Sequence, residues 1–134
     1  MRTRYGAVIV GALVGTALRV GITELFPVAG TGFPWPTLVV NVVGAFVLGT
    51  LTGAAWGSAP DWLKAAIGPG LLGSFTTFSA VAVALASLPV ATAIGYAAAS
   101  VLLGLGAAYA GLRLGGGRRP VSYTHLTLPT IYSV

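Results

Sequence analysis

The stretch "GPGLLGSFTTFS" at residues 68–79 interrupts one of the most apolar segments of the chain and decides how that segment folds. Glycine and threonine weaken a helix, and the backbone groups freed at a break need new partners because hydrocarbon offers none. Freed carbonyl oxygens face a water-filled cavity or coordinate a cation in discontinuous membrane helices. We therefore predict a break near the middle of a membrane-spanning helix. A simple kink at Pro69 is the alternative interpretation of the same residues.

The composition around this stretch indicates an integral membrane protein. Of the 134 residues, 56% are hydrophobic and 7% are charged, whereas a soluble domain has about 25% charged residues. We therefore expect membrane lipid to surround the chain. The bases are scattered or lie near chain ends, so no nucleic-acid partner is expected. The sequence contains no cysteine, which excludes disulfides, thiolate zinc sites and thiol chemistry.

Four apolar segments are long enough to cross a bilayer, which takes about 20 residues for a helix. They cover residues 5–26, 36–56, 62–88 and 90–114. We predict an all-α integral membrane protein with four transmembrane helices, the third broken near mid-membrane, in a single domain over residues 1–120. Trp35, Trp56 and Trp62 lie at segment ends, where amphipathic rings favour the headgroup level.

The basic residues predict the orientation of these helices. Four spans put the N-terminus, the second loop and the C-terminus on one side of the membrane. Six of the bases fall on that side: Arg2, Arg4, Lys64, Arg113, Arg118 and Arg119. The first and third loops carry no Lys or Arg. Because cytoplasmic loops carry an excess of bases, we expect a multi-pass protein of the plasma membrane with both termini cytoplasmic.

The last stretch, "VSYTHLTLPTIYSV" at residues 121–134, differs in composition from the rest of the chain. It is rich in Thr, Ser, Tyr and Ile, and it is too short to span a membrane as a helix. We interpret it as a disordered or artefactual tail and assign no function to His125.

The ionisable residues do not form an enzymatic site. The two acids, Glu24 and Asp61, lie near opposite membrane faces, and the one histidine lies in the tail. General acid–base catalysis and metal-assisted hydrolysis therefore lack the groups that they need. We predict that the protein is not an enzyme.

Two polar residues lie within predicted spans. A charge at the bilayer centre costs at least about 2.5–3.5 kcal/mol, so it normally has a partner or a function. Arg19 either extends toward an interface, or it lines a vestibule or holds a turn. Asn41 either makes an interhelical hydrogen bond or lines a pore. Small residues at close-packing spacing, on their own, predict only a tight bundle: Gly11 and Gly15; Gly44, Gly49 and Gly53; Gly104, Ala108 and Gly111.

Three motifs, in order, resemble those of the CrcB/Fluc family of fluoride channels over nearly all of residues 5–115. "GALVGTALR" (11–19) is similar to that family's first-helix G-x-x-x-G-x-x-x-R pattern. "PTLVVNVVGAFVLG" (36–49) is similar to its second-helix P-T-L-x-x-N-x-x-G-x-F-x-x-G pattern, and "GLLGSFTTFS" (70–79) to its third-helix signature. Each motif alone is weak, but three in sequence in a four-span chain are specific.

The resemblance implies a fluoride-specific channel that rejects chloride and exports fluoride passively from the cell. It also implies an antiparallel dimer with two pores. A structural Na⁺ at the dimer centre would be held by the backbone carbonyls of Gly73 and Thr76. Carbonyl oxygens are hard ligands, which suits a hard cation.

The resemblance further implies the residues that contact fluoride. Asn41 would donate an amide N–H, and Phe78 would present the positive edge of its ring. Ser79, Tyr96 and Ser100 would add hydroxyl donors, the last two sharing one helix face because they are four residues apart. Arg19 would lie near a vestibule in a structural role.

One departure from the family pattern affects the expected assembly. The family commonly continues T-T-F-S-T-F, whereas this chain has Ala80 and Val81 in the last two positions. One hydroxyl and one ring edge are thereby lost, and the one-sided bases favour a single orientation. The partner is therefore a second copy or, in a heterodimer, a related subunit of opposite orientation. Two further alternatives are a small four-span multidrug or cation exporter, which Glu24 by the loop disfavours, and a non-conducting structural subunit.

Overall fold

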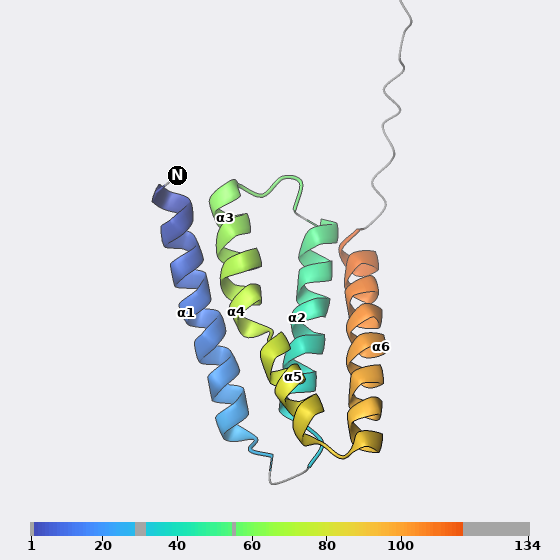
Figure 1. Cartoon of the computed structure of the whole chain (residues 1–134). Helices are drawn as coiled ribbons and strands as arrows, with labels where there is room; N and C mark the ends of the chain where they lie inside the picture. The colour runs from blue at the N-terminus through green and yellow to red at the C-terminus, as the bar shows by residue number, and fades with distance from the viewer. Residues whose placement is uncertain (1, 29–31, 55, 117–134) are drawn as a thin grey trace, which may run out of the picture.

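The computed structural model describes residues 2–28, 32–54 and 56–116, and all of the regular secondary structure in them is helical (Figure 1). The first, second and last helices are continuous, whereas the third span consists of several shorter segments. The elements are α1 (Arg2–Leu25), α2 (Trp35–Ala54), α3 (Asp61–Ala65), η1 (Ala66–Leu72), α4 (Gly73–Phe75), α5 (Phe78–Ser87) and α6 (Val90–Gly115).

Four helical stretches are long and apolar enough to cross a membrane. They are Thr3–Leu25, Trp35–Ala54, Asp61–Ser87 and Val90–Gly115. At most 22% of the apolar window in each stretch is buried inside the chain, so most apolar side chains face outward, as lipid-facing or partner-facing helices require. The prediction of an all-α, multi-pass membrane protein with four spans is confirmed.

The helices pack as two close pairs. α2 packs along α6, and α1 packs along α3, η1 and α4, whereas α1 and α2 touch little (Figure 1). Glycines permit the close approach of α2 and α6. A Cβ at Gly49 would meet the Ala108 carbonyl, and one at Gly111 would meet the Phe46 carbonyl. The predicted tight packing of small residues is thus confirmed here, whereas the Cβ position of Gly104 is open in the single chain, so the prediction for that residue stays a prediction.

The third span departs from α-helical geometry at two places. Residues Ala66–Leu72 form a π-helical segment around Pro69; proline lacks the N–H that a regular α-helix needs, and a wider turn accommodates that loss. α4 then ends at Phe75 and α5 begins at Phe78. Between them, Thr76 (φ −77°, ψ 155°) and Thr77 (φ −146°, ψ 122°) have extended backbone. We call residues 76–77 the interruption.

One end of the molecule gathers charged residues. The Arg4 guanidinium forms an ion pair with the Asp61 carboxylate, which joins the first turn of α1 to the start of α3. The last turn of α6, which carries Arg113, lies at the same end (Figure 1). Four antiparallel helices require this arrangement. Arg118, Arg119 and the atypical tail at 121–134 lie outside the described residues.

Candidate functional site

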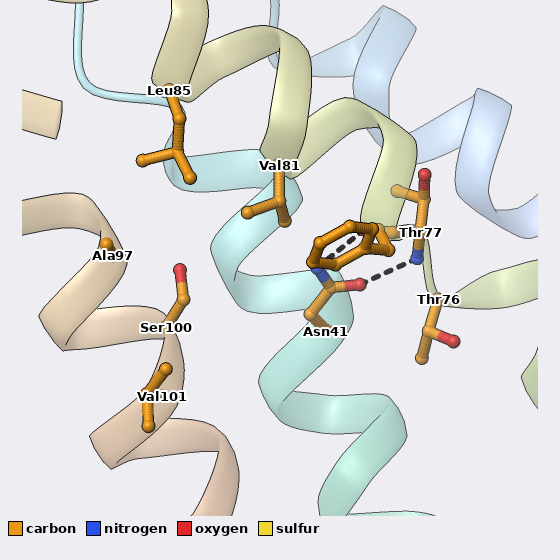
Figure 2. A pocket seen from close by; sticks show the side chains of 9 residues that line it. Asn41, Thr76, Thr77, Val81, Leu85, Ala97, Ser100 and Val101 are labelled. Carbon is orange, nitrogen blue, oxygen red and sulfur yellow. Dashed lines mark hydrogen bonds between the residues drawn. The ribbon is translucent and has the colours of Figure 1, made fainter.

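The side chain of Asn41 on α2 holds the interruption in place. Its Nδ2 donates to the Thr77 carbonyl at 3.0 Å, and its Oδ1 accepts from the Thr77 N–H at 2.8 Å (Figure 2). The amide thus satisfies both backbone groups of one extended residue, as a neighbouring strand would. A primary amide carries two N–H donors, so one N–H of Asn41 remains for another acceptor.

The two threonines close the helix ends on either side of the interruption. Thr76 donates from its backbone N–H and from its hydroxyl to the Leu72 carbonyl, at 3.0 and 2.9 Å. Thr77 caps α5, because its Oγ1 accepts from the Ala80 N–H at 3.2 Å. It also lies 3.1 Å from the Ser79 hydroxyl. Side-chain oxygens of this kind satisfy groups that a helix terminus leaves unpaired.

Arg19 on α1 reaches the same region from the other side. Its Nε donates to the Ser74 carbonyl at 3.2 Å, and its side chain is partly buried. Two side chains from two different helices, Asn41 and Arg19, therefore bind the backbone of residues 74–77.

These contacts decide which carbonyls lose their helical donors. In a continuous α-helix the N–H of residue i bonds the carbonyl of residue i−4. The Thr77 N–H goes to Asn41 instead of Gly73, and the Ala80 N–H goes to the Thr77 hydroxyl instead of Thr76. Ser74 receives Arg19 as a replacement donor. The oxygens of Gly73 and Thr76, which the resemblance singled out, are thus deprived of their helical donors.

A pocket of about 410 Å³ lies beside the interruption, between α2, α5 and α6. Asn41 on α2 and Ser100 on α6 line it from different helices (Figure 2). Most of its wall is apolar. The lining residues are Asn41, Thr76, Thr77, Phe78, Val81, Leu85, Ala97, Ser100 and Val101.

The predicted site residues divide into two groups by position. Asn41, Phe78 and Ser100 line the pocket, whereas Ser79 and Tyr96 do not. Phe78 is 82% exposed in the single chain. Ser79 is exposed next to it, and Tyr96 is completely buried in the wall behind.

Two hydroxyls near the pocket are buried without a partner. Tyr96 Oη and Ser100 Oγ are inaccessible to solvent and have no hydrogen-bond partner among the described residues. Buried hydroxyls are almost always paired with protein groups or ordered water. These two hydroxyls, one turn apart on α6, are therefore available to donate to an acceptor that enters the region.

The sequence did not predict the role of two residues in this region. Phe33, in a segment expected to be a loop, packs edge-on against Tyr96, with ring centroids 5.4 Å apart and planes at 83°. Val81 stands where the family commonly has phenylalanine. It is buried with Leu38 and Tyr96 and also forms part of the pocket wall. The one signal for Phe33 was a large apolar residue among glycines and prolines.

A second pocket, of about 330 Å³, lies between α2, η1 and α4. It shares Asn41 and Thr76 with the first pocket and extends to Leu48 and Gly68. A Cβ at Gly44 would meet the Thr76 methyl group, so glycine makes room for the interruption there. Asn41 and Thr76 thus stand where the two pockets meet.

Comparisons with known proteins match nearly the whole described chain. A family model described as "CrcB-like protein, Camphor Resistance (CrcB)" matches residues 6–112. A Thermus thermophilus protein named fluoride-specific ion channel FluC is 41% identical over 123 residues, covering 84% of this chain and 95% of its own. Deinococcus radiodurans and Rhodospirillum centenum proteins of the same name are 44% and 46% identical, covering 78% and 63% of this chain and 89% and 72% of theirs. The chain therefore belongs to the CrcB-like protein family.

Proposed function

We propose that this protein is a fluoride-specific ion channel that lets fluoride leave the cell passively. The observation that supports the proposal most directly is the pair of buried hydroxyls of Tyr96 and Ser100, which have no recorded partner among the described residues and lie beside a pocket that Asn41 also lines. The names of the relatives support the same ion. A channel of this kind performs no covalent chemistry, so it is not an enzyme.

The donor set suits a small anion that must enter and leave. Conduction requires binding that is favourable at entry but weak enough for release. Asn41, Tyr96 and Ser100 offer neutral donors without a fixed positive charge. Phe78 and Ser79 follow directly at the start of α5, where a ring edge and a hydroxyl add weakly positive groups. The apolar remainder of the wall limits competing water contacts.

We further propose that a Na⁺ ion binds the carbonyls of Gly73 and Thr76. Both oxygens lose their helical donors at the interruption, and Gly73 is exposed in the single chain. Among the described residues there is no cluster of His, Cys, Asp or Glu that could hold a metal. Backbone oxygens are the remaining hard ligands, and the charge of Na⁺ would attract the partial negative charge on each of them.

The proposed assembly is an antiparallel dimer, with the interruption near mid-membrane. Two carbonyls from one chain do not complete a cation site, so a second chain supplies the rest. The second chain would also bury the ring of Phe78, which is 82% exposed in the single chain. The charged end formed by Arg4, Asp61 and Arg113 is proposed to face the cytoplasm in this chain.

Fluoride efflux from liposomes containing the purified protein tests the function. We expect fluoride to leave rapidly once potassium can also cross the membrane and balance the charge, while chloride-loaded liposomes retain their anion. A cationic dye loaded in parallel should stay inside, which separates the channel from a multidrug exporter. Absent fluoride flux from correctly assembled protein, or equal chloride flux, would refute the proposal.

A further inference from the structure

One face of α1 follows the third span at regular intervals of four residues. Gly11, Gly15 and Arg19 lie on that face, because residues four apart in a helix are neighbours. A Cβ at Gly11 would meet the Ala66 carbonyl, and one at Gly15 would meet the Leu71 carbonyl. Arg19, the next member of the row, donates to the Ser74 carbonyl.

The row on α1 changes from glycine to arginine at the level where the third span passes from η1 to α4. Along η1 the two helices are in backbone contact, so only glycine fits. Beyond it the span approaches the interruption, and the Ser74 carbonyl faces α1 without the Phe78 N–H that a continuous helix would supply. A long side chain with a donor bridges that position.

We propose that Arg19 is a positioning residue that selects which carbonyls remain for the cation. By donating to the Ser74 oxygen, it removes that oxygen from those that lack a helical donor, so the oxygens of Gly73 and Thr76 remain for the cation. The same bond fixes the peptide planes between them. Arg19 is not among the residues that line the first pocket. This inference rests on the proposed cation site at Gly73 and Thr76 and adds the residue that shapes it.

The competing role for Arg19 is electrostatic recruitment of an anion. The ion pair recorded among the described residues joins Arg4 to Asp61, so the Arg19 charge has no carboxylate partner there. A charge-based role requires a cation at position 19, whereas a positioning role requires a hydrogen-bond donor. Arg19→Gln keeps a donor and loses the charge, and Arg19→Met loses both.

Two measurements on the purified full-length protein separate these roles. The first is hydrogen–deuterium exchange of the segment 73–80 in Na⁺-free buffer. The second is the Na⁺ concentration that gives half of the maximal increase in Tm. We expect Arg19→Met to speed exchange in that segment and to raise the Na⁺ midpoint about tenfold, which corresponds to about 1.4 kcal/mol. Arg19→Gln should stay within about threefold of the wild type.

Arg113→Met is the matched control, because it removes an arginine whose recorded contact is with Tyr109 on exposed α6. It should leave both readouts unchanged. Wild-type exchange in Arg19→Met, or equal effects of Gln and Met, would overturn the positioning role. If Na⁺ does not raise the Tm of the wild type, the proposed cation site fails. The exchange measurement then still decides whether Arg19 holds the segment, but its role in selecting cation ligands falls.

Discussion

Replacing Asn41 with leucine removes both hydrogen bonds that hold Thr77. Leucine has a similar volume but neither a donor nor an acceptor, so the Thr77 N–H and carbonyl lose their partners at 2.8 and 3.0 Å. We therefore expect the interruption to shift, with loss of fluoride flux and a measurable loss of stability. The effect on flux and the effect on stability have one structural origin.

The magnitude follows from the number of bonds and their surroundings. Interhelical hydrogen bonds in membrane proteins contribute about 0.6–1.7 kcal/mol each, whereas a buried unsatisfied group costs about 1–3 kcal/mol. Thr77 lines a pocket of about 410 Å³, which is large enough to hold water, so the lower range applies. Two bonds then give a loss of about 1–3 kcal/mol.

Reversible unfolding in bicelles or mixed micelles measures the stability, and liposome efflux measures the flux. Thr52→Val is a suitable control on the same helix, because the Thr52 hydroxyl bonds only the Leu48 carbonyl one turn back and is exposed. Its effect should stay below about 0.5 kcal/mol. Full stability and normal flux in Asn41→Leu would show that the Asn41–Thr77 pairing does not hold the interruption.

Three further predictions concern the pore, the packing and the assembly. Ser100→Ala should reduce fluoride flux at least about tenfold without loss of stability, because the lost hydroxyl has no recorded partner among the described residues; strong destabilisation would argue against an anion role. Gly111→Ala should destabilise the α2–α6 pair by about 1–3 kcal/mol in the unfolding assay, whereas Gly104→Ala, with an open Cβ position, should not; equal effects would contradict close packing. This chain reconstituted alone should conduct poorly if it needs a related partner of opposite orientation, and robust flux with termini on both membrane faces would exclude that requirement.

The sequence by itself determined the number of spans and the end at which charges gather. Both are properties of local composition: about 20 apolar residues form a helix across a bilayer because every backbone polar group must bond within it. The motif around Thr76 and Thr77 also indicated where the third span loses its regular helix. Glycines such as Gly49 and Gly111 marked contact faces in advance, because close helix approach excludes a Cβ.

Only the tertiary structure decided which groups meet at the interruption. Asn41 and Thr77 are 36 residues apart, and Arg19 and Ser74 are 55 apart. Both contacts depend on how α1 and α2 pack against the third span, and helix periodicity does not encode that packing. The same holds for Phe33, whose ring reaches Tyr96 from a loop. A polar residue inside a span must find some partner, but which partner is fixed only when the helices are assembled, because hydrogen bonds act over about 3 Å.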